Sequence, residues 1–139
     1  MTPKLGPQTD PKWRGNSGIY LKMSYEMQVL ETHDLPAMID GCGAVYEVKA
    51  PLVVACFDQL MWNTYEIEFK APIYDARGTK TANARFTKVV LNGKVVQLDT
   101  EVPGMTRSGQ PEAPGPQPIK LQDHQHTVQF RNIWAIPRN

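Results

Sequence analysis

Clustered prolines and glycines restrict the fold of this chain more than any other feature. The 139 residues include twelve prolines and ten glycines, which gather in the segments 3–18 and 103–118. Proline removes a backbone donor and glycine favours turns, so neither segment is expected to hold a long regular element. Elsewhere few windows keep an apolar period of 3.6 residues, which argues against a helical bundle or a coiled coil. We expect a lead-in over 1–15 and a long loop over 103–118.

Short stretches of alternating apolar and polar residues predict β-strands between and after these clusters. In 25–30, Glu26 and Gln28 alternate with apolar residues, which places both polar side chains on one strand face. The same alternation recurs in 65–70, and apolar runs predict further strands. These lie over 19–23, 119–122 and 128–136, the last long enough for a central strand.

The dipeptide Asn92-Gly93 separates two apolar runs, 86–91 and 94–98. Both of its residues readily take the positive φ angles of a type I′ turn, so a β-hairpin is predicted here. About eight short strands with long connections favour an all-β fold, an antiparallel two-sheet jelly roll. We assign it to a single domain over 16–139.

Charge and hydropathy exclude two classes of partner. Fifteen Lys and Arg against fourteen Asp and Glu leave a net charge of +1, and no basic run could neutralise a row of phosphates, so no nucleic acid partner is expected. The longest apolar stretch, 52–57, is far shorter than the roughly 20 residues that cross a bilayer, so no membrane partner is expected either. The first residues carry no signal-peptide pattern, so a targeting peptide is missing or was removed.

Cys42 and Cys56 are the only two cysteines. A disulfide between them would close a loop of about 15 residues, worth roughly 3 kcal/mol. Two buried thiols in a reducing compartment are an equally good interpretation. The spacing fits neither a redox motif nor a zinc site.

Polar residues near predicted strand ends are the candidates for chemistry. His124 and His126 share a face if their segment is extended, which suits a metal or an acid–base pair, although solvated turn residues would look the same. Glu26 and Gln28 would also look the same on a solvated outer face. If Glu26, Gln28, His124 and Arg131 converged on one concave sheet, they would form a polar site. Of the three tryptophans, Trp62 and Trp134 are expected in the core, and Trp13 is freer to stack on a sugar.

Seven motifs occur in the order found in the 3-keto-disaccharide hydrolase-like family, which this sequence therefore resembles. They are Asn16–Leu21, Tyr25–Leu30, Cys42–Tyr46, Trp62–Ile67, Leu91–Gly93, Leu121–His124 and Phe130–Trp134. The resemblance implies a concanavalin A-like fold and a periplasmic or extracellular protein. It also implies a hydrolase whose carbohydrate substrate is a glycoside with a ketone at C3.

The resemblance implies roles for individual residues. A base would remove the C2 proton, which the C3 ketone acidifies, and donors would stabilise the enolate oxygen. His124 is expected to be the base or a proton shuttle. Glu26 and Gln28 would hold substrate, with a divalent cation as an open alternative. The expected donors are Arg131 and Asn16, and the further substrate contacts are Asp123 and His126.

Two further expectations come from the resemblance. It favours the Cys42–Cys56 disulfide, since similar exported proteins carry this pair. Family domains also contain strands before the Asn16–Leu21 motif, so we expect an incomplete sandwich whose open sheet edge is covered by self-association. A carbohydrate-binding module or a surface interaction domain without catalysis are the alternatives to an enzyme.

Overall fold

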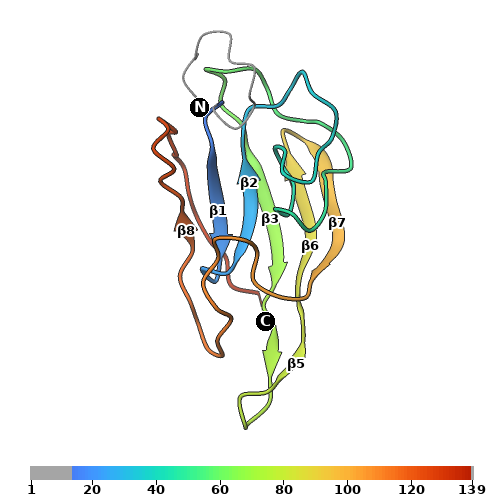
Figure 1. Ribbon diagram of the computed structural model, residues 1–139, viewed down its shortest axis with the longest axis vertical. Coiled ribbons are helices and arrows are strands. Elements are labelled where there is room, and N and C mark those ends of the chain that lie inside the picture. Colours follow the sequence, from blue (N-terminus) through green and yellow to red (C-terminus); the bar gives the residue numbers. More distant parts are fainter. Residues whose placement is uncertain (1–13, 139) are drawn as a thin grey trace.

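The computed structural model describes residues 14–138, in which two antiparallel sheets form a β-sandwich and no helix occurs (Figure 1). In that part of the chain, nothing helical is therefore available to span a membrane. The strands are β1 (Ser17–Leu21), β2 (Tyr25–Val29), β3 (Tyr65–Lys70), β4 (Ile73–Tyr74), β5 (Lys80–Ala82), β6 (Ala84–Leu91), β7 (Lys94–Val102) and β8 (Lys120–Leu121). The all-β prediction is confirmed.

Each main sheet has three strands. Sheet I has the order β2-β1-β8, sheet II has the order β3-β6-β7, and β4 and β5 form a small separate hairpin. The segment 43–46 lies along the outer side of β2, where the amide of Gln28 donates to the carbonyl of Ala44 (3.0 Å) and that of Tyr46 donates to the carbonyl of Glu26 (3.1 Å). Sheet I is thus widened by one irregular segment.

The hydrophobic core lies between the two sheets. Tyr25 and Met27 of β2 are fully buried and belong to one apolar cluster with Phe86 of β6. The ring of Phe69 joins the two sheets, because its centroid lies 5.5 Å from that of Tyr25 and 5.2 Å from that of Phe86. Each such buried side chain contributes about 1.5–3 kcal/mol, which makes these contacts the main force between the sheets.

The hairpin between β6 and β7 has the predicted turn. Asn92 has a φ of 50° and Gly93 a φ of 79°, the two positive values that a type I′ turn needs. The side chain of Asn92 also accepts a hydrogen bond from the Thr64 amide (2.9 Å) and donates to the Ala55 carbonyl (2.8 Å). Asn92 therefore fixes both the turn and the loop that precedes β3.

The long loop over 103–118 is confirmed as irregular, and it is tied to the turn between β1 and β2. The Thr106 amide donates to the carbonyl of Ser24 and the Gln110 amide to the carbonyl of Met23, both at 2.9 Å. The loop then leads into β8. Most of the lead-in over 1–15, including Trp13, lies outside the described residues.

The prediction of a strand over 128–136 is wrong, since these residues belong to neither sheet. The segment contacts β3 and the residues before it through side chains, because Arg131 stacks on Trp62 and the Arg138 guanidinium lies 3.8 Å from the Glu68 carboxylate. These are side-chain contacts, and a strand forms only where a neighbour accepts its backbone hydrogen bonds. Trp134 is 78% exposed, so its placement in the core was also wrong.

This segment carries the first testable prediction, which concerns self-association. Ile133, Trp134 and Ile136 are all more than half exposed, and contiguous exposed apolar residues favour contact between molecules. We expect the wild-type protein to self-associate at micromolar concentration in light scattering and Trp134→Ser to weaken this association. Ile73→Ser, which changes an exposed apolar residue of β4 outside this segment, serves as the control. A strictly monomeric wild type would contradict the prediction.

Candidate functional site

One face of sheet I is polar and turned away from the core. The register pairs Tyr20 with both Glu26 and Lys120, and Gly18 with Gln28. Because alternate residues of a strand share a face, these side chains lie together. We call this surface the polar face, and its members are Gly18, Tyr20, Glu26, Gln28, Lys120 and Gln122.

Glu26 is a buried carboxyl group at the centre of the polar face. Its side chain is 3% exposed, so of the two alternatives left open by the sequence the solvated outer strand face is excluded. The Tyr20 hydroxyl donates a hydrogen bond to Glu26 Oε2 (2.7 Å) and accepts one from Gln122 Nε2 (3.3 Å). Burial raises the pKa of Glu26 to about 7, although the Tyr20 hydrogen bond and the charge of Lys120 oppose this rise. The carboxyl group can therefore exchange a proton near neutral pH.

The missing side chain of Gly18 makes room for Glu26. A Cβ atom at position 18 would lie 2.3 Å from Glu26 Oε1, so the carboxylate extends directly over this glycine. Gln28 and Gln122 flank Gly18 on the two neighbouring strands, since Gly18 pairs with Gln28 and accepts a hydrogen bond from the Gln122 amide (2.9 Å). Glu26 Oε1 therefore lies over a strand position whose neighbours on both sides are glutamines.

Both glutamines present an acceptor without a donor. Gln28 Nε2 donates to the carbonyl of Asp40 and Gln122 Nε2 donates to Tyr20, which fixes the orientation of the two amides. Gln28 Oε1 and Gln122 Oε1 are buried and have no hydrogen-bond partner in the described part of the chain. Buried acceptors nearly always have a donor, so this place suits a ligand that carries hydroxyl groups.

Gly18→Ala tests this arrangement, and it is the second prediction. The new methyl group would overlap Glu26 Oε1 and push the carboxylate away from Tyr20, so we expect a loss of about 1–3 kcal/mol in the free energy of unfolding. Urea denaturation measures this loss. Gly104→Ala is the matched control, because a Cβ there meets no atom within 4 Å. Equal stability of the two variants would show that Gly18 is not needed for space.

The two histidines lie beyond one end of the polar face. The Asn16 amide, just before β1, donates to His126 Nδ1 (2.8 Å), and the His124 ring lies edge-on to His126 with centroids 5.6 Å apart. Burial and the neighbouring His124 lower the pKa of His126. Asn16 precedes Gly18 by two strand residues, about 7 Å along the chain. The carboxylate of Asp123 accepts a hydrogen bond from the backbone amide of Gln125 (3.0 Å), which shapes the turn between the two histidines.

Among the expected site residues, Arg131 lies elsewhere. Its guanidinium covers the Trp62 ring at 3.8 Å from the centroid, and it makes no hydrogen bond to Glu26 among the residues that the structure describes. Conversely, sequence patterns did not single out Tyr20, Lys120 or Gln122. These residues meet only because β1 pairs with β8, about a hundred residues later in the sequence. No local sequence pattern reveals that pairing.

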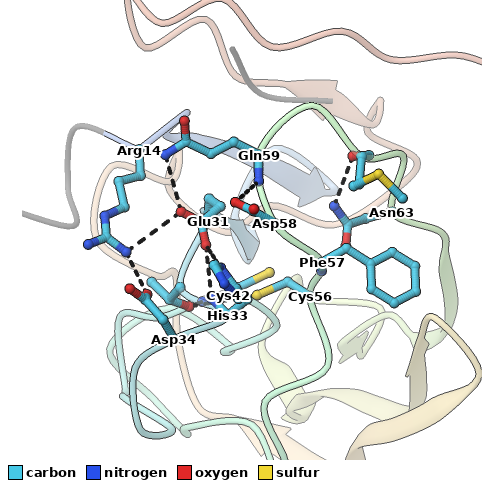
Figure 2. A network of polar contacts seen from close by, with 12 residues as sticks. Arg14, Glu31, His33, Asp34, Cys42, Cys56, Phe57, Asp58, Gln59 and Asn63 are labelled. Carbon is cyan, nitrogen blue, oxygen red and sulfur yellow. Dashed lines mark hydrogen bonds and ion pairs between the residues drawn. The ribbon is translucent and has the colours of Figure 1, made fainter. Parts of the chain in front are cut away.

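A second polar network lies where the chain leaves β2 (Figure 2). Glu31 is 3% exposed; its Oε1 lies 2.5 Å from His33 Nδ1, and its Oε2 accepts a hydrogen bond from Gln59 (3.3 Å). The hydrogen bond to Glu31 raises the pKa of His33. Arg14 donates to Asp34 (2.6 Å). This network was not predicted, although Glu31 and His33 lie two positions apart in the sequence, as do His124 and His126.

Neither polar cluster fits a resident divalent cation. Ligand atoms of Glu31, His33 and Asp34 all lie within 4.8 Å of one another, which is a suitable donor set by type. However, the Arg14 guanidinium lies 3.6 Å from Glu31 and 2.6 Å from Asp34, so a positive charge is already in place. On the polar face, the positive charge of Lys120 already lowers the pKa of Glu26, although the two groups form no ion pair in the described structure.

The two cysteines are free thiols that face each other in the interior (Figure 2). Cys42 Sγ lies 3.1 Å from the Tyr65 hydroxyl, and Cys56 Sγ lies 4.0 Å from Thr32 Oγ1. The hydrogen bond between the thiols raises the pKa of Cys42 and lowers that of Cys56. Their proximity is compatible with a disulfide, which stays a prediction.

A cavity of about 420 Å³ lies by the hairpin of β4 and β5. Two of its basic residues already have acidic partners, Lys80 with Glu112 (2.7 Å) and Arg85 with Glu101 (2.6 Å).

In the part of the chain that the structure describes, the polar face has no comparable opening, because the side chains of Tyr20, Glu26 and Gln28 are buried. A ligand can reach Glu26 only after a covering side chain moves.

Comparison with known proteins agrees with this fold. Residues 4–136 match the 3-keto-alpha-glucoside-1,2-lyase-like domain. A crystal structure from Parabacteroides distasonis, described as that of a candidate glycosyl hydrolase, superimposes with a TM-score of 0.74 at 33% sequence identity. The alignment covers 86% of this chain and 52% of that one, so the chain spans about half the length of its solved relative. No curated protein matches. The chain belongs to the family of 3-keto-alpha-glucoside-1,2-lyase-like domains.

Proposed function

We propose that this protein cleaves glycosides whose sugar carries a ketone at C3, by elimination followed by hydration. The observation that carries the proposal is Glu26, a buried carboxyl group with a pKa of about 7. Tyr20 binds only its Oε2 atom, which leaves Oε1 for a substrate. Membership of the family and the description of the solved relative support a glycoside as substrate.

The reaction needs one base and one proton donor. The C3 ketone acidifies the C2 proton, which the Glu26 carboxylate removes, and the electron pair moves onto the C3 oxygen as an enolate. When the enolate collapses, the C1–oxygen bond breaks and the departing alcohol takes a proton. Water then adds at C1 of the resulting enone, and C2 regains a proton.

The polar face can supply the remaining contacts. Gln28 Oε1 and Gln122 Oε1 lack donors in the described structure and would accept hydrogen bonds from sugar hydroxyls. The histidine pair, which Asn16 connects to the start of β1, would exchange protons with a group bound at that end of the face. In this proposal His124 is the proton shuttle and Glu26 the base. The reverse assignment is decided by comparing the Glu26→Gln and His124→Ala variants.

The rate of cleavage is expected to depend on pH through Glu26, which is the third prediction. Only the carboxylate form accepts the C2 proton, so kcat/KM should rise with pH and level off above the pKa of about 7. The profile is measured with a 3-keto-glycoside at constant ionic strength. A rate that is independent of pH from about 5 to 9 would exclude Glu26 as the base.

Incubation with 3-keto-trehalose tests the function itself. We expect release of glucose and 3-keto-glucose, whereas trehalose, which lacks the ketone, should remain intact. Binding of the sugar without cleavage would instead support a carbohydrate-binding module. If the sugar is neither bound nor cleaved, a surface interaction domain is the better description.

A further inference from the structure

Lys120 lies on the polar face beside the proposed base. It pairs with Tyr20 from β8, while Glu26 pairs with the same tyrosine from β2. The Lys120 ammonium lies 3.9 Å from the centroid of the Tyr20 ring, and the hydroxyl of that ring is bound to Glu26. A cation over an aromatic face gains about 0.5–2 kcal/mol. The ammonium is thus held above the ring that orients the carboxylate.

The ammonium of Lys120 is available for a new partner. It makes no hydrogen bond or ion pair with any residue in the described range 14–138, and the Tyr20 ring is its recorded contact. Three other cationic side chains already have partners. Lys22 donates to the carbonyl of Gly115 (2.5 Å), Arg107 to the carboxylate of Glu47 (3.0 Å), and Arg131 covers Trp62.

The proposed reaction requires a positive charge at a place that Lys120 can reach. Removal of the C2 proton puts negative charge on the C3 oxygen, one bond further along the sugar. The base and the cation must therefore lie close together without neutralising each other. Glu26 and Lys120 flank one tyrosine on adjacent sides of β1, and strands in a sheet are about 4.8 Å apart.

We propose that Lys120 is the catalytic group that stabilises the enolate. When a 3-keto sugar binds, the ammonium leaves the Tyr20 ring and donates a hydrogen bond to the C3 oxygen while Glu26 removes the C2 proton. The C2 proton goes to Glu26, the electron pair goes to the C3 oxygen, and Lys120 keeps its charge throughout. This role rests on the proposed function, and it replaces the expectation that Arg131 supplies the charge.

The same movement opens part of the polar face. Tyr20 is fully buried and Glu26 nearly so, although the face on which they lie points away from the core. Lys120 covers the Tyr20 ring, so its displacement uncovers the face of the ring whose hydroxyl binds Glu26. In this proposal, binding of the sugar and movement of the Lys120 ammonium to the C3 oxygen occur together.

Lys120→Met removes the charge and keeps the length of the side chain. Loss of one oxyanion donor typically lowers kcat by about 10²–10³, and we expect at least the lower end of this range, with a smaller change in KM. Lys120→Arg should retain part of the rate. Lys94→Met, which changes an exposed residue at the start of β7, is the control and should leave the rate unchanged.

A second readout does not depend on turnover. Because the charge of Lys120 lowers the pKa of Glu26, Lys120→Met should move the Glu26 titration to higher pH in carbon-detected NMR. If the wild type is active and Lys120→Met has the same kcat as the wild type, the role of Lys120 is overturned and the proposed function remains intact. A wild type that neither cleaves nor deprotonates a 3-keto sugar would overturn both.

Discussion

Replacing Glu26 with glutamine is expected to lower the rate of 3-keto-glycoside cleavage by a factor of about 10²–10⁴, the usual contribution of a positioned base. The amide keeps the shape of the side chain, and its oxygen can still accept the hydrogen bond from the Tyr20 hydroxyl. It cannot take the C2 proton. Steady-state kinetics with 3-keto-trehalose measures the loss. Glu66→Gln, which changes an exposed carboxylate of β3, is the control and should have the wild-type rate.

The stability of Glu26→Gln separates a lost base from a lost fold. Burial raises the pKa of Glu26 from its ordinary 4.5 to about 7, so the unfolded chain loses this proton first as the pH rises. The wild type should therefore lose stability between those two pH values and remain less stable above them. The glutamine variant has no charge to bury and should unfold no more easily than the wild type at alkaline pH. If it keeps the wild-type rate while His124→Ala loses it, the base is His124.

Oxidation of Cys42 and Cys56 to a disulfide is expected to stabilise the protein by about 3 kcal/mol, the value for a closed loop of about 15 residues. Both thiols are buried and face each other. The thiolate forms first on Cys56, whose pKa is lowered by the hydrogen bond from Cys42. Urea denaturation of the oxidised and the reduced protein measures the difference.

Two observations check the assignment of this disulfide. Intact mass should show the loss of two hydrogen atoms on oxidation, and a Cys42→Ala/Cys56→Ala variant should unfold identically with and without oxidant. The prediction is contradicted if both thiols of the folded protein still react with a labelling reagent after oxidant treatment. In that case the pair is a packing feature of the core.

The elements that depend on local sequence were the ones that could be predicted. The hairpin at Asn92 and Gly93 needs only two positive φ angles and two apolar runs, and β2 and β3 follow from alternation. The segment 128–136 has an equally good strand pattern, but a strand also needs a neighbour along its length. No pattern within the segment reports whether that neighbour exists, and Trp134 is exposed for the same reason.

The candidate site was predictable in part. Alternation placed Glu26 and Gln28 on one face, yet it could not show that this face is buried, and burial is what raises the pKa of Glu26. Lys120 enters the site only through the pairing of β8 with β1. Arg131 belongs to a recognisable motif, but its contact with Trp62 depends on the path of the chain after β8.

Cleavage of 3-keto-trehalose in deuterated water tests the central claim most directly. Elimination followed by hydration returns a solvent proton to C2, so the account predicts glucose and 3-keto-glucose that carries deuterium at C2, above the exchange in an enzyme-free control. Direct hydrolysis leaves the C2 hydrogen in place. Products without deuterium at C2, or recovery of the intact disaccharide, would contradict the account.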